Sequence, residues 1–463
     1  MPRPTTSRRL ASALLLACST ADAWTSNFAD TTLNVSQVAV AQPETSGRFL
    51  GSPSLVRLPS GVLLASHDEF GPGTARGQRT AFVRASRDGG QTWADSGTGG
   101  ATAIADMYWA TLFVRAGDAA VYLLGVSNDG NVAGEPAQAT ISRSVDEGAT
   151  WTSPAVRLTA ASNASFSTGP TPVLLAGGRL WRALEHNVGP GWASGYSTCV
   201  LSAAADAPDL LDPRAWTLSG ELPFAGAVAA RVPAAWRRPG VDSSFGWLEG
   251  GAVDPGDGGA TGIRVMLRVN SLPAANKAAL VSLASPGATP VFEGFVDFFP
   301  GGMTKFSVRR DAVSGLYVSL TNNVSDDSVS LPPSCAAVPA PAGPLPCCGF
   351  LTYCSNSAPT CLWCHAVARN VLTLSVSAAL DSGWRVAATV LADDTGVPGF
   401  MSELLVGFQY VDFQFDNDGD DIIYAVRAAY RGANQYHNAN RHLFGIIQGW
   451  RARAAASARV RGA

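Results

Sequence analysis

Short runs of strand-forming residues recur along the chain, and turns rich in glycine, proline, serine and aspartate separate them. The first clear pair covers 51–66, where two apolar runs flank a Pro-Ser-Gly turn at 59–61. The same arrangement recurs at 109–125, 171–184 and 246–269. Two strands joined by a tight turn form a hairpin, so the pattern predicts an all-β chain built from consecutive antiparallel hairpins.

One turn motif occurs twice, 58 positions apart. It runs from Ser86 to Trp93 as Ser-Arg-Asp-Gly-Gly-Gln-Thr-Trp, and from Ser144 to Trp151 as Ser-Val-Asp-Glu-Gly-Ala-Thr-Trp. Serine and aspartate oxygens can bond to the backbone of a tight turn, glycine supplies a positive φ, and the tryptophan buries a large ring. Degenerate copies begin at Ser202 and at 377–384. Repeats at this spacing predict an architecture of similar sheets.

The repeated motif resembles the Asp-box of the sialidase superfamily, whose members are six-bladed β-propellers. The resemblance implies one propeller over 24–450, in which the motif is a structural turn on the face opposite the active site. We expect 33–40 to be a strand that closes the last blade. Blade five is expected to start at Lys305, to stop for a Cys-rich insert over 325–366, and to resume at 371–376. A basic tail over 451–463 follows the last blade.

Composition and charge limit the classes of binding partner that the sequence indicates. Charged residues make up 15% of the 463 residues and the formal net charge is −3, so neither nucleic acid nor an acidic membrane surface is indicated as a partner. Residues 1–23 carry a basic start, an apolar run and a small-residue end, which predicts a cleaved export signal and a secreted protein. We expect no membrane span after it. Three Asn-x-Ser sites fit glycan attachment, at Asn34, Asn163 and Asn323.

Cysteine placement predicts a disulfide-stapled insert. Loss of the signal removes Cys18 and leaves a cluster over 335–364 together with an isolated Cys199. In an exported chain, such a cluster favours disulfides, whose pairing the sequence leaves open, and Cys199 is expected to be a buried free thiol. The run Cys361–His365 fits a haem-attachment pattern, but the neighbouring cysteines favour disulfides. The run 416–421 begins like a calcium loop but lacks its later ligands. We therefore expect no cofactor and no metal.

The resemblance also implies a set of catalytic residues. Sialidases bind a substrate carboxylate with arginines, and they attack with a neutral tyrosine activated by glutamate, because an anionic nucleophile would be repelled. The segments that resemble theirs assign Glu249 as the base, Arg268 and Arg369 as carboxylate ligands, and Tyr410 as the nucleophile. Taken alone, Tyr410 in its aromatic strand fits a core position better than a nucleophile, and Arg268 fits a strut to a neighbouring aspartate equally well.

The front of the chain departs from the sialidase pattern. The first arginine motif is replaced by Gly-Ser-Pro at 51–53, so that arginine is missing unless Arg48 reaches the site. The polar cluster His67-Asp68-Glu69 lies on a Gly/Pro-rich loop, where we assign Asp68 as the proton donor and Glu69 as the next candidate. Two further candidate substrate contacts are Glu185, at the end of an inner strand, and His437, near the last hairpin.

The expected function is a secreted, sialidase-like exo-glycosidase that hydrolyses a terminal sugar, acidic or neutral, from a glycan. The alternative is a non-catalytic glycan-binding propeller that has lost the proton donor and the first arginine, and a third reading is a protein-interaction platform. A catalytic site requires a proton donor near the Tyr410 hydroxyl across a sugar-sized gap, and a binding site does not. The sequence leaves the sugar and the oligomeric state open.

Overall fold

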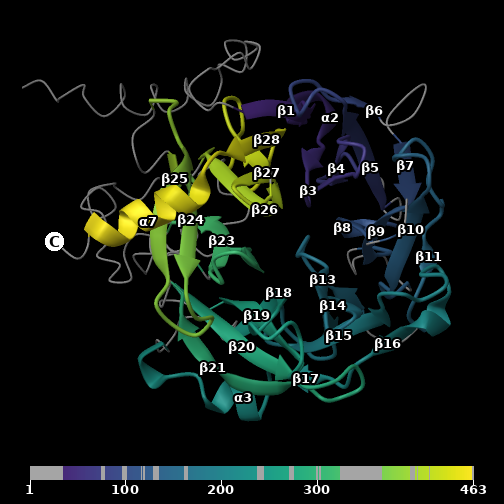
Figure 1. Cartoon of the computed structure of the whole chain (residues 1–463). Helices are drawn as coiled ribbons and strands as arrows, with labels where there is room; N and C mark the ends of the chain where they lie inside the picture. The colour runs from purple at the N-terminus through teal and green to yellow at the C-terminus, as the bar shows by residue number, and fades with distance from the viewer. Residues whose placement is uncertain are drawn as a thin grey trace, which may run out of the picture.

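The computed structural model describes residues 35–460, except 75–78, 96–101, 116, 118–119, 129–134, 161–164, 237–244, 271–275, 299–300, 302–303, 324–367, 397–401, 404 and 417. Six antiparallel sheets follow one another around a ring, like the blades of a propeller (Figure 1). In five of the sheets the strands run in chain order from the centre outward, and in the sixth the first strand of the chain, β1, is added at the outer edge. The predicted six-bladed all-β fold is confirmed.

From the centre outward, blade one contains β2 (Phe49–Leu50) and β3 (Ser54–Arg57), β4 (Leu63–Phe70), β5 (Thr80–Ser86), β6 (Ala94–Asp95) and β7 (Thr102–Ala105). Blade two contains β8 (Tyr108–Val114), β9 (Val121–Val126), β10 (Ala139–Ser144) and β11 (Val156–Arg157). Blade three contains β12 (Phe166–Ser167) and β13 (Leu174–Ala176), β14 (Arg179–Asn187), β15 (Tyr196–Ala204), β16 (Trp216–Leu218) and β17 (Leu222–Pro223). In blades one and three the innermost strand is split in two, and both parts pair with the same second strand.

Blade four contains β18 (Gly246–Val253), β19 (Ile263–Asn270), β20 (Lys277–Leu283) and β21 (Val291–Asp297). Blade five contains β22 (Ser307–Arg310), β23 (Tyr317–Asn322), β24 (Val371–Ser377) and β25 (Arg385–Ala392). Blade six contains β26 (Gly407–Asp416), β27 (Asp421–Ala429), β28 (Arg441–Ile447) and β1 (Val35–Val40). The described helices are α2 (Pro43–Ser46), α3 (Ala227–Ala230), single 3-10 turns at Pro213–Ala215 and Ala234–Trp236, and α7 (Trp450–Val460). None of the helices in the described ranges has the length and apolar character needed to cross a bilayer.

The N-terminal strand closes the ring. Strand β1 pairs antiparallel with β28 as the outermost strand of blade six, with Val35 opposite Gly445 and Val40 opposite Arg441. The first and the last described strands therefore share one sheet (Figure 1). The predicted closing strand is confirmed, and it turns the seam of the ring into a ladder of backbone hydrogen bonds.

A long segment of sequence separates the second and third strands of blade five. Strand β23 ends at Asn322 and its partner β24 begins at Val371, and the predicted insert over 325–366 lies wholly outside the described residues. The clustered cysteines over 335–364 lie outside the described residues, and their disulfides stay a prediction. Cys199 is a buried free thiol, as expected.

Both copies of the repeated motif form the same turn between the third and fourth strands of a blade. The Ser86 hydroxyl bonds to Asp88 Oδ1 at 2.7 Å and accepts the Gly90 N–H at 2.8 Å. Ser144 makes the matching bonds to Asp146 and Gly148 at 2.7 and 2.8 Å. Because each turn satisfies its own polar groups, the motif acts as scaffold.

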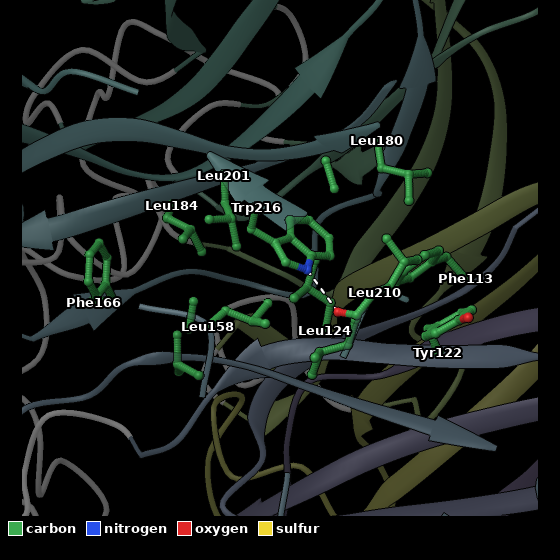
Figure 2. Packing of buried hydrophobic residues seen from close by; sticks show 14 of the residues in the cluster. Phe113, Tyr122, Leu124, Leu158, Phe166, Leu180, Leu184, Leu201, Leu210 and Trp216 are labelled. Carbon is green, nitrogen blue, oxygen red and sulfur yellow. Dashed lines mark hydrogen bonds between the residues drawn. The ribbon is translucent and has the colours of Figure 1, made fainter. Parts of the chain in front are cut away.

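Apolar side chains fill the spaces between neighbouring blades. Figure 2 shows the cluster between blades two and three, in which Trp216 and Leu201 of blade three pack with Leu124 of blade two. The Trp216 indole N–H donates to the Leu210 carbonyl at 2.8 Å, so the polar end of the ring is satisfied within the cluster. Such packing fixes the distances between blades, and with them the distances between side chains that different blades supply.

The start of the predicted basic tail is helical. Helix α7 packs against β25 (Figure 1), its Trp450 ring is buried, and Arg451 pairs with Asp311 at 2.8 Å. The helix is therefore joined to blade five by both apolar packing and an ion pair.

Candidate functional site

Three innermost strands carry a β-bulge near their first residues, and each bulge holds a non-glycine residue with positive φ. These residues are Trp109 in β8 (φ 48°), Glu249 in β18 (φ 56°) and Tyr410 in β26 (φ 57°). Each strand shifts its register against the next strand at that point. A bulge redirects a side chain, and a left-handed conformation in a non-glycine residue persists only where the surroundings hold it. The bulges therefore mark a place where three blades hold side chains in fixed, redirected orientations.

The site lies on the face opposite the repeated turns. In blade one, Leu63 pairs with Ser86, where the repeated turn begins, whereas Asp68 pairs with Ala81 towards the other end of β4. In blade five, Ser377 marks the turn end of β24, and Asn322 pairs at the other end of that strand. Arg369 precedes β24 at this same end. The strand ends that flank 324–367 thus belong to the face that carries Asp68.

Tyr410 and Glu249 meet across the ring. The Tyr410 hydroxyl donates a hydrogen bond to Glu249 Oε1, and Arg268 Nη1 lies 2.9 Å from Glu249 Oε2. Glu249 is only 6% exposed. Burial alone raises the pKa of Glu249, but the Arg268 charge and the hydrogen bonds from Tyr410 and Arg268 hold it below its usual value. The carboxylate is therefore ionised and is bound to the phenol that sequence analysis pairs with it.

Two more arginines lie near the Tyr410 ring. The Arg427 guanidinium carbon is 4.1 Å from the ring centroid, and that of Arg369 is 6.0 Å from it. Both guanidiniums donate to Gln409 Oε1, which fixes them relative to one another. The structure thus brings together Tyr410, Glu249, Arg268 and Arg369, and adds Arg427 to them.

Arg427 is the buried residue beside Tyr410 that sequence analysis missed. It lies on β27 directly opposite Gln409 and is 5% exposed. In the run 422–429 it is the one charged residue among apolar neighbours. A charge in a buried strand must face a partner or a cleft, so this isolation was the available signal. Blade six therefore places a third buried arginine, besides Arg268 and Arg369, next to the Tyr410 side chain.

Asp68 lies beside this cluster, beneath the bulge of blade two. Its Oδ2 accepts the Trp109 N–H at 2.8 Å, and its side chain is packed so closely that a Cβ on Gly51 would come within 1.9 Å of Oδ1. Burial raises the pKa of Asp68 to about 6, although the nearby charges of Arg427 and Arg79 lower it. The Arg427 charge lowers the pKa of both Asp68 and Tyr410, so one guanidinium acts electrostatically on both the carboxyl and the phenol.

Glu185 binds the backbone of the bulge that contains Glu249. Its Oε1 accepts the Gly250 N–H at 2.7 Å, and the side chain is fully buried. Burial raises the pKa of Glu185 to about 8. The bulge of blade two is held in a similar way, because Arg182 donates to the Trp109 carbonyl at 3.3 Å. Contact between Glu185 and a substrate stays a prediction.

The remaining candidates lie around this centre. His67 is buried, with its ring 5.5 Å from Phe82, and burial lowers its pKa to about 4. Arg48 is half exposed and pairs with Glu69 at 3.5 Å. His437 lies 5.1 Å from the Phe70 ring, which in turn contacts Arg427. Of these four residues, His437 is linked to the arginine cluster through Phe70, and substrate contacts for all four stay predictions.

Comparison with known proteins rests on structure. No protein-family model matches the sequence, and no curated protein matches it. The sialidase of Trypanosoma rangeli superposes on 90% of this chain with a TM-score of 0.51 and 12% identity. The chain has the propeller fold of the sialidases. It spans 57% of the length of that enzyme, so the remainder of the trypanosome sialidase has no counterpart in the match.

Two further sialidase folds match over a similar length. The leech intramolecular trans-sialidase, complexed with 2,7-anhydro-Neu5Ac, has a TM-score of 0.51 at 12% identity, covering 90% of this chain and 70% of its own. The intramolecular trans-sialidase of Ruminococcus gnavus has a TM-score of 0.50 at 13% identity, covering 91% and 98%. Identities this low show the sialidase fold and leave the activity to the residues of the site.

Proposed function

We propose that this protein is a retaining exo-glycosidase that removes a terminal acidic sugar from glycans. The observation that carries the proposal is the hydrogen bond from Tyr410 to the ionised Glu249 inside a group of three buried arginines. A phenol bound to a carboxylate is an activated nucleophile. Three guanidiniums around it exceed what one Glu249 carboxylate neutralises, so the site favours a substrate that brings a negative charge of its own.

In the first step, the Tyr410 oxygen attacks the anomeric carbon while its proton passes to Glu249 Oε1. Burial and the Glu249 charge raise the pKa of Tyr410, so the phenol arrives neutral and is not repelled by an acidic sugar. The bond from the anomeric carbon to the leaving oxygen breaks, and Asp68 gives that oxygen its proton. The product is a glycosyl-tyrosine intermediate.

In the second step, the roles reverse. Asp68, now ionised, takes a proton from water, and the water oxygen attacks the anomeric carbon. The bond to Tyr410 breaks, and Glu249 returns the proton to the phenolate oxygen. Two displacements on opposite faces leave the configuration of the sugar unchanged. A pKa of about 6 suits Asp68 to both roles, because each protonation state is populated near that pH.

The alternative is a glycan-binding propeller without turnover. The burial of Asp68, which is 2% exposed, favours it, because a proton donor must reach the leaving oxygen. A binding protein needs the arginines but not the donor. The predicted export signal over 1–23 lies outside the described residues, and from it we infer that either activity is extracellular.

Turnover decides between these functions. Purified protein is assayed with 4-methylumbelliferyl α-N-acetylneuraminide and a panel of neutral aryl glycosides, and the first-formed anomer is read by NMR. We expect release of the acidic sugar with retention, and a loss of kcat of at least about 1,000-fold in Tyr410→Phe. Saturable binding of the acidic glycoside without any release from the panel would refute catalysis and support the binding protein.

A further inference from the structure

Lys305 is an ionisable side chain that the proposed mechanism does not use. It is one of two lysines in the chain, it directly precedes Phe306 in blade five, and it is 2% exposed. Its Nζ lies 2.8 Å from the Pro170 carbonyl, 2.8 Å from Ser307 Oγ and 2.6 Å from the Val411 carbonyl. An ammonium has three donors and no acceptor, so these contacts from blades three, five and six use all of its hydrogen-bonding capacity.

The Val411 carbonyl is the important acceptor, because it follows the nucleophile directly. The ladder between β26 and β27 pairs Gln409 with Arg427 and then Asp412 with Ala425, so it skips Tyr410 and Val411. A buried carbonyl without a hydrogen-bond partner destabilises the fold, so the Val411 carbonyl needs another donor.

The missing ladder bonds at Val411 are replaced by side chains of blade five. The Val411 carbonyl accepts from Lys305 Nζ, and it also accepts from the Ser307 hydroxyl at 2.7 Å. In the bulged conformation, which gives Tyr410 its positive φ, these two side chains satisfy the carbonyl.

Lys305 also lies next to the base. A Cβ on Gly169 would be 3.2 Å from Glu249 Cγ and 3.6 Å from Lys305 Cγ, so the two side chains flank the same glycine. Burial lowers the pKa of Lys305 to about 7; the charges of Asp412 and Glu249 raise it, and those of Arg182 and Arg309 lower it. Burial of an ammonium costs free energy, so a contribution to stability alone explains the position of Lys305 poorly.

We propose that Lys305 is a positioning residue for Tyr410. By holding the Val411 carbonyl, it keeps the β26 bulge in the conformation in which the Tyr410 hydroxyl meets Glu249. The kinetic part of this inference rests on the proposed function, whereas the structural part does not.

The test removes the ammonium and retains the aliphatic length. Lys305→Met is compared with wild type and with Lys277→Met, which changes the only other lysine, an outer-strand residue that pairs with Asp297 at 2.6 Å. Steady-state kinetics use 4-methylumbelliferyl α-N-acetylneuraminide. We expect kcat to fall about 100-fold, as for a misplaced reacting group, while KM changes less than about threefold. Lys277→Met is expected to match wild type.

Crystal structures of the same variants give a second measurement. In Lys305→Met we expect Tyr410 to leave the positive-φ region and its hydroxyl to separate from Glu249. If wild type releases no sugar, the proposed function fails, but these structures still decide the positioning role. The inference is overturned if Lys305→Met leaves Tyr410 in place, or if it keeps kcat within about threefold of wild type.

A milder variant covers the case in which Lys305→Met does not fold. Ser307→Ala removes one of the two donors to the Val411 carbonyl and leaves Lys305 in place. We expect it to fold and to lower kcat about threefold to tenfold, in line with the loss of one neutral hydrogen bond. An unchanged kcat in this variant, with Tyr410 unmoved, would also overturn the inference.

Discussion

Replacement of Arg427 by methionine tests whether blade six supplies the missing carboxylate ligand. The change removes the guanidinium and keeps much of the apolar length. Arg427 is 5% exposed and its guanidinium carbon lies 4.1 Å from the Tyr410 ring centroid. Any effect on kinetics therefore arises inside the site, where salt and solvent screen charges little.

The expected magnitude follows from the bond that is lost. A hydrogen bond between charged groups contributes about 1.5–3 kcal/mol, and each 1.4 kcal/mol corresponds to about tenfold in binding. We therefore expect KM for an acidic sugar to rise about 10-fold to 100-fold. The carboxylate is bound in both the ground state and the transition state, so kcat should change much less than KM.

The assay compares 4-methylumbelliferyl α-N-acetylneuraminide with its uncharged methyl ester. Arg427→Met should bind the acidic glycoside more weakly and should bind the ester as wild type does. The preference for the acid over the ester should therefore be about 10-fold to 100-fold smaller in the variant than in wild type. Arg57→Met is the control, because Arg57 bonds Asp416 at 2.7 Å near the repeated-turn face. If the variant weakens the acid and the ester equally, or leaves KM for the acid unchanged, Arg427 does not bind the carboxylate.

Three further predictions concern the proton donor, its packing and the core. Burial raises the pKa of Asp68 to about 6 and the donor acts in its protonated form, so kcat/KM should fall about tenfold per pH unit above pH 6. This fall should be absent in Asp68→Asn. If the fall persists in Asp68→Asn, it belongs to the titration of another group. In Gly51→Ala the new Cβ would lie 1.9 Å from Asp68 Oδ1, so the carboxyl must move and kcat should drop about 10-fold to 100-fold. Gly294→Ala, with open space around its Cβ, should be neutral, and equal activities of the two variants would contradict this account. Trp216→Ala should lower the free energy of unfolding by about 3–5 kcal/mol in urea titration, whereas a loss under about 1 kcal/mol would mean that the cluster in Figure 2 repacks.

Sequence reasoning reached the fold through local chemistry. The repeated turn motif needs only residues within one hairpin, so its spacing could be read directly and gave the blades. The closing strand at Val35–Val40 followed from the alternation of 33–40 together with the propeller resemblance, and the break after Asn322 followed from the Cys-rich composition of 325–366. Tyr410 and Glu249 were found as a pair only through the resemblance, since nothing in the sequence alone relates positions in blades four and six.

The part of the site that could not be predicted depends on register. A bulge shifts the alternation of a strand, so the residues that face the centre cannot be counted from the sequence. The shift between Gln409 and Asp412 decides that Arg427 lies beside Tyr410. The shift between Leu248 and Gly251 likewise brings the Gly250 N–H to Glu185, which therefore lies behind the bulge. Register is a property of paired strands, and one strand's sequence does not contain it.

The seam in blade six has a consequence for the order in which the protein gains activity. Val35 and Gly445 lie at opposite ends of the sequence, and contacts between distant positions close late in folding. Until β1 joins β28, blade six, which carries Tyr410 and Arg427, lacks its outermost strand, and its backbone is joined to blade one by the hydrogen bond from the Leu50 N–H to the Ala439 carbonyl at 2.9 Å. The last ladder to form therefore also fixes Tyr410 against Asp68 and Glu249. During refolding, activity should appear with the final kinetic phase, after most strands have already formed.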